Sequence, residues 1–305
     1  MTDLYPSRQG TRPALLPRRD PVVYSNWTKD AAISKAQAEQ FDRDGYLVLD
    51  DVFTAAEVIA LQGEASSLLG DPAALEAETV ITEPGEAEIR SVFMIHKQNA
   101  VMARLAADNR LAGVARFLLG DDVYVHQSRL NYKPGFEGKE FYWHSDFETW
   151  HVEDGMPRMR ALSMSVLLAL NTPFNGPLML IPESHRKYLT CVGETPENHY
   201  RMSLKKQEYG VPDKDSLSAL ATEHGIVAPT GNPGNVVIFD CNIMHGSNGN
   251  ITPFPRANAF IVYNALSNRL VSPFGAKTPR PEFIAARDDV SALEKPRITL
   301  LGAAA

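Results

Sequence analysis

Cysteine is scarce in this chain: Cys191 and Cys241 are the only two among 305 residues. Two cysteines exclude a disulfide framework and a zinc site built from cysteines. We expect both to be reduced thiols, as in a cytoplasmic protein, with a single bridge between them as the alternative. The chain also lacks any run of 18 apolar residues, and its first residues lack the apolar stretch of a signal peptide. We therefore expect a cytoplasmic location and no membrane partner.

Positive charge is also in deficit. The chain has 30 Lys and Arg against 37 Asp and Glu, which gives a formal net charge of −7. Such a chain does not attract nucleic acid or anionic membranes through its overall field. Any anionic cosubstrate would have to be held by individual arginine or lysine residues. The hydrophobic share of 44% and the charged share of 22% are ordinary for a globular enzyme with a substantial core.

The composition divides the chain into an N-terminal arm and one domain. Residues 1–34 are rich in Pro, Arg and Asp without periodicity, and we predict that they wrap the surface as an arm. No internal repeat, low-complexity tract or linker divides the remainder. Residues 35–305 are therefore predicted to form a single domain.

The first part of this domain is predicted to be helical. A capping box formed by Thr54 and Glu57 begins an apolar-periodic helix that ends at Gly70. A second helix is predicted over residues 101–119. The acidic, proline-bearing segment 71–92 between them is predicted to be a long loop or lid.

In the second half of the chain the hydrophobic period changes to two. Residues 123–133 alternate so that four polar side chains share one face of a strand: Gln127, Arg129, Asn131 and Lys133. A polar row of this kind is either a solvent-facing surface or the lining of a polar cavity.

More strands are predicted over four segments: 161–170, 178–181, 235–240 and 258–266. Pro, Gly and Asn turns separate them. This pattern predicts an α+β fold that is mainly β: a double-stranded β-helix core, jelly-roll and cupin-like, with an N-terminal helical layer. Barrels of this type carry a metal in their mouth.

Residues 141–155 combine histidines, acidic residues and aromatic residues directly after the polar strand. Side chains two apart on a strand share a face, so His144 and Asp146 are predicted to point at one ion. They would be two arms of the two-histidine, one-carboxylate triad that holds non-haem Fe(II) with open positions. The pair alone is weak evidence, because chance supplies such pairs and His151-x-Glu153 is a second one. An ordinary strand histidine beside a surface aspartate is the alternative.

A distal histidine and a basic residue beyond it strengthen the iron hypothesis. His245 follows the apolar strand 236–239, far enough downstream for intervening strands, and is the candidate third ligand. Arg256 follows across a proline-rich turn, at the start of the next strand. A bidentate arginine suits the far carboxylate of a dicarboxylate cosubstrate. Ser247 lies on the same face as His245 and would add a hydroxyl donor.

Lys133 offers a second cation at the end of the polar strand, with a solvated surface lysine as the alternative. Other histidines are predicted to serve elsewhere. His151 lies where the strand is breaking, and His126 lies on the opposite face from Gln127, which favours a core or interface role. Four histidines lack an acidic partner at ligand spacing and are predicted to be structural or exposed: His96, His185, His199 and His224.

Taken together, the residues resemble a known family. The segment 141–155, continued by Met156 and Pro157, closely resembles the signature of the ectoine hydroxylases, a branch of the phytanoyl-CoA dioxygenase superfamily. Residues 41–50 also resemble the N-terminal element of that superfamily. The resemblance covers residues 41–280 and shows no departure at the ligand positions.

This resemblance implies a jelly-roll enzyme that binds Fe(II), 2-oxoglutarate and O2. The implied catalytic iron ligands are His144, Asp146 and His245. The implied 2-oxoglutarate-binding residues are Arg256, Ser247, Lys133 and Asn131. In such enzymes the decarboxylation of 2-oxoglutarate to succinate and CO2 is coupled to hydroxylation of L-ectoine. The product, 5-hydroxyectoine, is a compatible solute of osmotically stressed bacteria, and a homodimer is the expected assembly.

The chemistry of ectoine matches three more residues. This substrate is a zwitterion with a carboxylate and a delocalised amidinium ring. Arg280 would clamp the carboxylate, and Trp150 would lie against the cationic ring. Gln127 would hydrogen-bond a ring nitrogen or the carboxylate. A packing role for the tryptophan and a surface position for the arginine are the alternatives.

Two rival hypotheses remain open. One is the same oxygenase chemistry on another small, amino-acid-like substrate such as proline, which a substrate panel would separate. The other is a non-catalytic cupin-like protein that binds an osmolyte, which iron-dependent succinate release would separate. A halogenase is disfavoured because Asp146 occupies the position that a halide would need.

Overall fold

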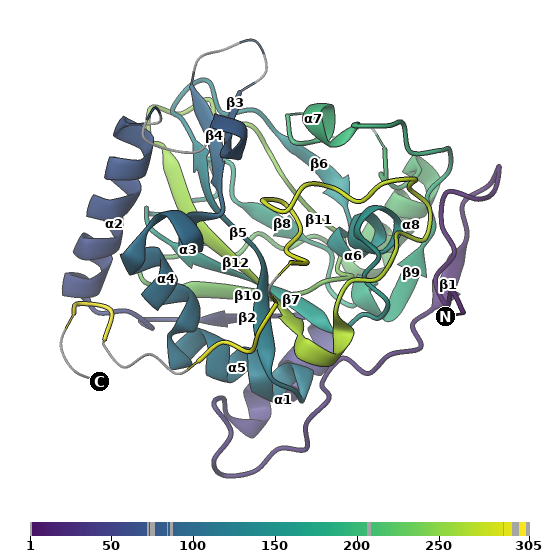
Figure 1. Cartoon of the computed structure of the whole chain (residues 1–305), viewed down its shortest axis with the longest axis horizontal. Helices are drawn as coiled ribbons and strands as arrows, with labels where there is room; N and C mark the ends of the chain where they lie inside the picture. Colours follow the sequence, from purple (N-terminus) through teal and green to yellow (C-terminus); the bar gives the residue numbers. More distant parts are fainter. Residues whose placement is uncertain are drawn as a thin grey trace.

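The computed structural model describes residues 2–71, 73, 77–83, 85, 88–205, 209–288, 290–294 and 299–302. Within them, a seven-stranded sheet occupies the centre of the molecule (Figure 1). Its strands are β2 Tyr46–Leu49, β3 Val80–Thr82, β4 Ile89–Phe93, β5 Val123–Lys133, β7 Ala161–Leu167, β10 Val236–Asp240 and β12 Arg256–Ala265. Their order is β2-β10-β7-β12-β5-β4-β3, and every neighbouring pair is antiparallel.

A smaller sheet packs against one face of the large one. Its strands, in the order β6-β11-β8, are β6 Phe141–His144, β11 His245–Ser247 and β8 Leu178–Leu180. In β10, Val237 and Phe239 point toward this smaller sheet, whereas Val236 and Ile238 point to the opposite side. The period of two therefore buries apolar side chains on both faces of the large sheet. The arrangement confirms the predicted mainly β, jelly-roll core.

Helices cover the other face of the large sheet (Figure 1). They are α1 Lys35–Asp44, α2 Ala55–Gly70, α4 Ala100–Ala107 and α5 Asn109–Leu119. Shorter or more distant helices are α3 Ile95–Gln98, α6 Asp146–Thr149, α7 Tyr200–Ser203 and α8 Lys214–His224. The helical layer predicted at the N-terminal side of the domain is confirmed.

The helix boundaries agree with the sequence signals only in part. Thr54 and Glu57 form the predicted capping box at the start of α2. The single helix predicted over residues 101–119 is wrong, because the chain breaks at Asp108. This residue has an extended backbone, ends α4, and caps α5 by accepting a hydrogen bond from the Arg110 N–H (2.9 Å).

The predicted loop or lid at residues 71–92 is wrong in part. Residues 80–82 and 89–92 lie in β3 and β4, which pair with each other and extend the large sheet at its edge. The prediction failed because these strands are short and β3 carries no alternation of buried and exposed residues. Several residues between 72 and 87 lie outside the described part of the chain, so the prediction stays open there.

The N-terminal segment follows the surface of the domain (Figure 1). Its strand β1 Leu15–Pro17 pairs with β9 Lys187–Leu189, and Tyr5 is completely buried between Phe147 and Tyr188. The segment is thus attached to the domain by strand pairing and by a buried aromatic ring. The division of the chain at residue 34 stays a prediction.

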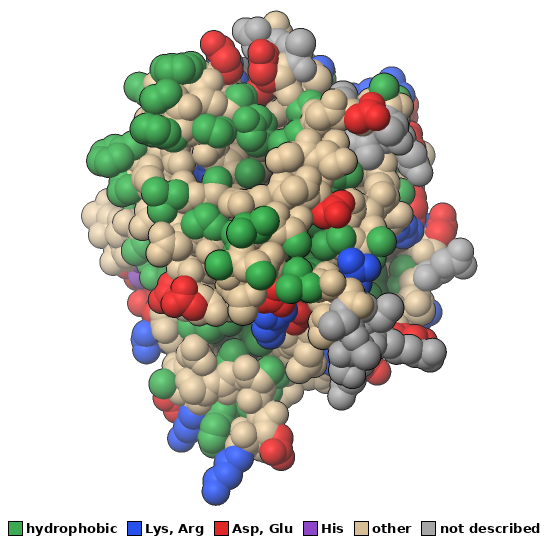
Figure 2. Space-filling view, turned by 90° about the vertical axis from the view of Figure 1, so that its left-hand side faces the viewer, with side chains coloured by type: hydrophobic (Ala, Val, Ile, Leu, Met, Phe, Trp, Pro, Cys, Tyr) green, Lys and Arg blue, Asp and Glu red, His purple; other side chains and the backbone are tan. Residues whose placement is uncertain are grey.

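Apolar side chains are exposed on one side of the molecule. Figure 2 shows hydrophobic side chains gathered in the upper left of one face. Four aromatic or aliphatic side chains in loops are largely exposed: Phe136 (63%), Phe174 (75%), Ile251 (85%) and Phe254 (70%). Two of these loops are joined by a hydrogen bond from the Phe136 N–H to the Thr252 carbonyl (2.9 Å). No helix in the described residues has the length and apolar character needed to cross a membrane.

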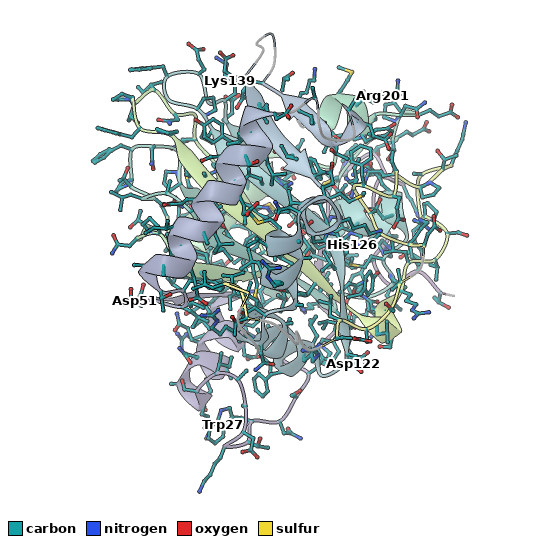
Figure 3. The ribbon with its side chains drawn as sticks, turned by 60° about the vertical axis from the view of Figure 1, so that its left-hand side comes forward. Trp27, Asp51, Asp122, His126, Lys139 and Arg201 are labelled. Carbon is teal, nitrogen blue, oxygen red and sulfur yellow. The ribbon has the colours of Figure 1, made fainter. Side chains whose placement is uncertain are left out.

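Strand β5 contains a bulge that decides which side chains reach the interior. The register with β12 shifts between Val262 and Tyr263, opposite His126. Val125 before the bulge and Leu130 after it both pack on the helical side, although they differ in parity. The extra residue therefore places His126 and Gln127 on the same side of the sheet. Figure 3 shows His126 in the interior of the molecule.

Candidate metal centre and its two cavities

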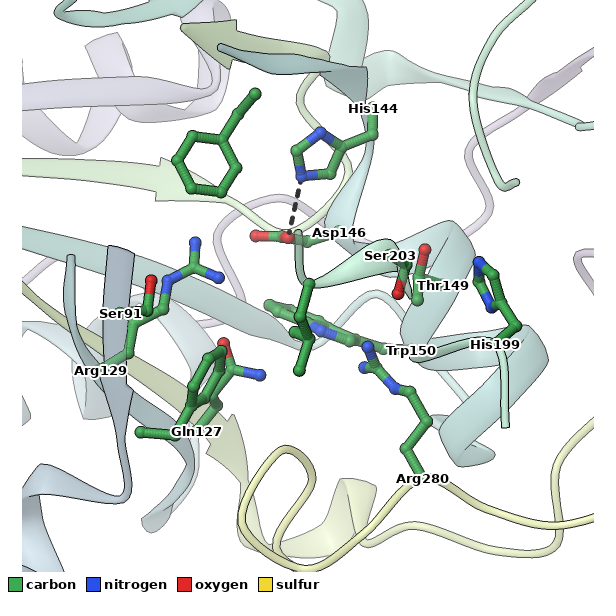
Figure 4. A pocket seen from close by; sticks show the side chains of 13 residues that line it. Ser91, Gln127, Arg129, His144, Asp146, Thr149, Trp150, His199, Ser203 and Arg280 are labelled. Atoms are coloured by element: carbon green, nitrogen blue, oxygen red, sulfur yellow. Dashed lines mark ion pairs between the residues drawn. The ribbon is translucent and has the colours of Figure 1, made fainter. Parts of the chain in front are cut away.

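Three side chains converge where β6 and β11 pair. His144 is the last residue of β6, and His245 of β11 lies opposite it. Potential ligand atoms of His144, Asp146 and His245 all lie within 4.8 Å of one another. The Asp146 carboxylate lies 3.7 Å from His144 Nε2, an interaction marked in Figure 4. It lies 3.8 Å from His245 Nε2. Two imidazoles and one carboxylate in this arrangement match the donor set of a non-haem Fe(II) site.

The reason given for bringing His144 and Asp146 together was wrong. We predicted that they share one face of a strand, but β6 ends at His144 and Asp146 is the first residue of α6. The turn from strand to helix at Ser145 brings the two side chains together. The candidate ligands are therefore correctly grouped for a different geometrical reason.

Both histidines are oriented by backbone carbonyls. Nδ1 of His144 donates to the Tyr142 carbonyl (2.7 Å), and Nδ1 of His245 donates to the Ile243 carbonyl (3.0 Å). Because a carbonyl only accepts, this pairing leaves each Nε2 free to bind a metal, as in many protein metal sites. Burial and the neighbouring His245 lower the pKa of His144 to about 4, so its imidazole is neutral near pH 7.

The carboxylate of the triad is held in its charged form. Burial alone would raise the pKa of Asp146, but His245, His144 and Arg129 together lower it below its ordinary value. The Ser163 hydroxyl also donates a hydrogen bond to Asp146 (3.3 Å). The donor set, two imidazoles and one carboxylate, therefore fits a divalent iron ion.

Two cavities meet at this centre, and we call them the inner and the outer cavity. The inner cavity is lined by Arg129, Asn131, Phe141, His144, Leu178, His245, Gly246, Ser247, Arg256 and Phe260. The outer cavity, drawn in Figure 4, is lined by Ser91, Phe93, Gln127, Arg129, Phe141, His144, Asp146, Thr149, Trp150, His199, Ser203, Leu204 and Arg280. Three of the four polar side chains of the β5 row, Gln127, Arg129 and Asn131, thus line cavities, and the row is not a solvent-facing surface.

Arg256 is a cation that lines only the inner cavity and has free donors. Its side chain is almost completely buried, and its Nη2 donates to Asn131 Oδ1 (2.7 Å). Its Nε and Nη1 have no hydrogen-bond partner among the described residues. Burial, Arg129 and Arg90 lower its pKa to about 10, which still leaves it charged near pH 7. A buried cation with unpaired donors is stable only beside an anion, so the inner cavity suits a carboxylate.

Lys133 lies behind the inner cavity and does not line it. Its ammonium donates to Ser247 Oγ (2.9 Å) and to the carbonyls of Lys139 (3.0 Å) and Asn248. Burial and the nearby Arg256 lower its pKa to about 6. Of the four residues assigned to 2-oxoglutarate, three line the inner cavity, whereas Lys133 contacts it only through Ser247. Its direct contact with the cosubstrate stays a prediction.

The three residues assigned to the substrate all line the outer cavity (Figure 4). Trp150 begins a π-helical turn, Trp150–Asp154, that continues α6. Gln127 donates through Nε2 to the Ile284 carbonyl (2.7 Å), so its Oε1 acceptor is not used in that bond. Arg280 is held by an ion pair with Asp154. Sequence spacing could not show that partner, because the two residues lie 126 positions apart.

The sequence interpretation missed other residues of the outer cavity. Arg129 lines both cavities. Its place in the polar row of β5 was the sequence feature that could have indicated this role. Thr149 also lines the outer cavity, and its buried hydroxyl has no hydrogen-bond partner in the part of the chain that the structure describes. His199 was predicted to be structural or exposed, yet it lines the outer cavity and lies 3.6 Å from Glu153. No local pattern distinguished Thr149 or His199.

The structure corrects the placement of His126 and leaves His151 outside both cavities. His126 was predicted on the opposite face from Gln127, but the β5 bulge turns it toward Trp150, with ring centroids 5.1 Å apart. His151 is stacked between aromatic rings and lies within hydrogen-bond distance of Asp3 (2.9 Å). It is not part of the candidate triad.

Comparisons with known proteins agree with this geometry. The family model for phytanoyl-CoA dioxygenase matches residues 41–258. An ectoine dioxygenase of Sphingopyxis alaskensis is 72% identical over 297 residues, which cover 97% of each chain. An ectoine dioxygenase of Stutzerimonas stutzeri is 57% identical over 292 residues, covering 96% of this chain and 97% of the relative.

Solved structures extend the likeness to the fold. The crystal structure of EctD from S. alaskensis with 2-oxoglutarate and 5-hydroxyectoine superposes with a TM-score of 0.91 and 66% identity. It covers 98% of this chain and 100% of the other. The same protein with bound Fe superposes with a TM-score of 0.89. A carbocyclase of nogalamycin biosynthesis, at 18% identity and a TM-score of 0.60, shares the fold alone.

Proposed function

Because the chain belongs to the phytanoyl-CoA dioxygenase family and closely matches its ectoine dioxygenases, we infer that it hydroxylates ectoine to 5-hydroxyectoine. It is a 2-oxoglutarate-dependent dioxygenase that uses Fe(II) and O2. Decarboxylation of 2-oxoglutarate to succinate and CO2 accompanies the hydroxylation. The reaction would serve the synthesis of a compatible solute under osmotic stress.

One structural observation carries this conclusion. The inner and outer cavities are separate, yet both are lined by Arg129, Phe141 and His144. An anion in the inner cavity and a second small molecule in the outer cavity would therefore meet at one candidate iron ligand. A binding protein with a single osmolyte pocket does not need two cavities that meet at a metal centre.

His144, Asp146 and His245 would hold the iron ion through two imidazole nitrogens and one carboxylate oxygen. Bound Fe(II) with open positions would supply the activation of O2 that couples decarboxylation of 2-oxoglutarate to hydroxylation. The protein's own residues hold the ion, orient the two organic ligands and exclude water. Hydrogen bonds from the two Nδ1 atoms to backbone carbonyls fix the ring planes before any ligand arrives.

Arg256 would anchor the far carboxylate of 2-oxoglutarate through its free Nε and Nη1. Asn131 holds the guanidinium in place by accepting from its Nη2 (2.7 Å). Lys133 donates a hydrogen bond to the Ser247 oxygen (2.9 Å), so the hydroxyl hydrogen of Ser247 can point elsewhere. Ser247 would donate that hydrogen to the same carboxylate. Lys133 would thus act mainly through Ser247.

Gln127, Trp150 and Arg280 would orient ectoine in the outer cavity. The guanidinium of Arg280 suits the ectoine carboxylate, and the indole face of Trp150 suits the delocalised ring cation. Thr149 would add its unpaired hydroxyl. A ligand held at three sides would present one ring C–H bond toward the iron, which is the requirement for a single hydroxylation site.

We also propose a cytoplasmic homodimer. Both cysteines are free and buried, which is consistent with a reducing compartment. The exposed apolar residues Phe136, Phe174, Ile251 and Phe254 form a surface that suits a protein interface. Light scattering of the wild type and of an Ile251→Asp, Phe254→Asp variant tests the assembly. A monomeric wild type would refute the dimer.

The function is tested by titrating the apoprotein anaerobically with Fe(II) and 2-oxoglutarate, and then adding O2 and ectoine. Mass spectrometry should detect a product heavier than ectoine by one oxygen atom and an equal amount of succinate. A panel containing proline and other small amino acids should give little product. Succinate without hydroxylated ectoine, or faster turnover of another substrate, would contradict the assignment.

A further inference from the structure

Arg280, which lines the outer cavity, is paired with a carboxylate of the protein itself. Its Nε lies 2.8 Å from Asp154 Oδ1, and its Nη2 lies 2.5 Å from Asp154 Oδ2. The exposed fractions of the two side chains are 9% and 0%. Both oxygens of Asp154 accept from one guanidinium, which fixes the plane of that group and leaves Nη1 outside the pair.

A second carboxylate lies close to the same arginine. Oε2 of Glu153 is 4.0 Å from Arg280 Nε. The other oxygen of Glu153, Oε1, pairs with Arg8 (2.7 Å). The positive charge of Arg280 is therefore compensated within the protein. The outer cavity holds a directional N–H donor at this end, but no uncompensated cation from Arg280.

The inner cavity has a cation that no carboxylate compensates. Arg129 lines both cavities, but Arg256 lines only the inner one, and among the described residues it is paired only with the neutral amide of Asn131. None of the described residues that line the inner cavity is acidic. The two cavities thus differ in charge although both contain arginine and both are lined by His144.

The two organic ligands differ in charge in the same way. 2-Oxoglutarate is a dianion, whereas ectoine is a zwitterion without net charge. We propose that Asp154 is a specificity-determining residue, which compensates and fixes Arg280 so that the outer cavity accepts zwitterionic ectoine and rejects 2-oxoglutarate. This proposal rests on the proposed function, in which ectoine occupies the outer cavity.

The physical reason is the low dielectric constant of a buried site. For a dianion beside Arg280, the negative charge of Asp154 would offset the attraction of the guanidinium, and water could not compensate for the lost hydration of the dianion. A zwitterion carries its own cation, so it depends less on an uncompensated positive charge in the protein. Arg280 can still donate to the ectoine carboxylate through Nη1, which Asp154 does not use.

The test uses the iron-loaded enzyme and the variant Asp154→Asn, which keeps the size of the side chain but removes its charge. Initial rates of hydroxyectoine formation are measured over a range of ectoine concentrations at several fixed 2-oxoglutarate concentrations. In the variant, 2-oxoglutarate should compete with ectoine for the outer cavity. Between moderate and high 2-oxoglutarate concentrations, the apparent KM for ectoine should rise by about tenfold. A change of about 1.4 kcal/mol in binding free energy corresponds to that factor. In the wild type the ectoine KM should be independent of 2-oxoglutarate above saturation.

Asp240→Asn is the matched control. Asp240 is also buried and pairs with an arginine, Arg18, at 2.7 Å, but it lines neither cavity. The control should show no inhibition by 2-oxoglutarate. The double variant Asp154→Asn, Arg280→Gln should not show the inhibition by 2-oxoglutarate that is expected in Asp154→Asn. In the double variant the uncompensated cation is absent.

The outcomes separate this proposal from the proposed function. A folded Asp154→Asn enzyme with the wild-type response to 2-oxoglutarate would overturn the role of Asp154. An unchanged ectoine KM in Arg280→Gln would instead overturn the assignment of the outer cavity to ectoine. If Asp154→Asn does not fold, Glu153→Gln tests the same charge argument with the Asp154–Arg280 pair intact. In Glu153→Gln, 2-oxoglutarate should compete with ectoine more weakly than in Asp154→Asn. A Glu153→Gln enzyme without this competition would overturn the proposal.

Discussion

Arg8 and Glu148 lie 140 positions apart and form a two-point ion pair whose side chains are 2% and 1% exposed. Arg8 Nη1 also donates to Glu153 Oε1 (2.7 Å). The two carboxylates belong to α6 and to the π-helical turn, whose residues Thr149 and Trp150 line the outer cavity. The N-terminal segment is therefore part of the support of that cavity.

Replacing Arg8 by Ala should destabilise the protein, because it removes the cation that pairs with buried Glu148 and one of the cations beside buried Glu153. Breaking one buried pair typically costs about 3–5 kcal/mol. Denaturant unfolding measures this loss, and the ectoine KM should rise more than the 2-oxoglutarate KM. Arg43→Ala is the control, since Arg43 pairs with Asp44 at the surface (62% exposed), where solvent screening leaves such a pair with little effect on stability. Equal stability of the two variants would argue against the supporting role.

Alanine at His144, Asp146 or His245 should abolish tight iron binding and hydroxylation. Each replacement removes one of three donors, and the remaining two cannot hold the ion in place. His151→Ala should retain the metal, because His151 lies outside the triad against Phe147. Iron content after desalting gives the comparison. A variant of the triad that retains stoichiometric iron would show that the ligand set is different.

Arg256→Ala should weaken 2-oxoglutarate binding strongly and ectoine binding only slightly. Removing one partner of a buried, hydrogen-bonded charge pair costs about 2–5 kcal/mol, roughly thirtyfold or more in affinity. Arg256→Lys should restore only part of this affinity, because lysine cannot donate as a planar pair. Asn131→Ala should produce a smaller loss by releasing the guanidinium. The role of Arg256 fails if the 2-oxoglutarate requirement is unchanged in the alanine variant.

Trp150→Ala should retain Fe(II) and 2-oxoglutarate but lose ectoine affinity. Contact between an aromatic face and a desolvated cation contributes ~2 kcal/mol, more than tenfold in binding. With ectoine poorly positioned, the variant should release succinate without an equal amount of hydroxyectoine. The ratio of the two products, measured by mass spectrometry, reports this uncoupling. Trp27→Ala is the control, because Trp27 is partly exposed and remote from the cavity lining. A ratio of one in Trp150→Ala would refute the contact.

Glu57 should make the protein's stability depend on pH in the acid range. The hydrogen bond from Arg110 lowers the pKa of Glu57 to about 2, from its ordinary value of 4.5. Because the folded-state pKa is depressed, the stabilisation is fully present above pH 4.5 and is lost as the pH falls toward 2. Glu57→Gln should therefore lower the Tm at pH 7 and have little effect near pH 2. Glu39→Gln, which alters an exposed pair with Lys35, should show no such pH dependence. A constant difference in Tm across this range would contradict the assignment.

The sequence by itself determined the local elements and the chemical types of the site. The capping box at Thr54 fixes the start of α2, because it satisfies backbone donors locally. Alternation of polar and apolar side chains predicts β5, since successive side chains on a strand point to opposite faces. The candidate donors His144 and His245 could be named because one histidine lies two residues from an aspartate and the other follows an apolar strand. This is the combination that a two-histidine, one-carboxylate metal site requires.

Only the tertiary structure decided how these elements meet. The bulge in β5 depends on pairing with β12, and it turned His126 to the same side as Gln127. The pairing of Arg280 with Asp154 and of Arg8 with Glu148 joins residues more than a hundred positions apart. Such contacts have no periodicity in the sequence, because they are fixed by the distance between packed elements. They set the charge and rigidity of the outer cavity, so the selection between its ligands depends on the folded structure.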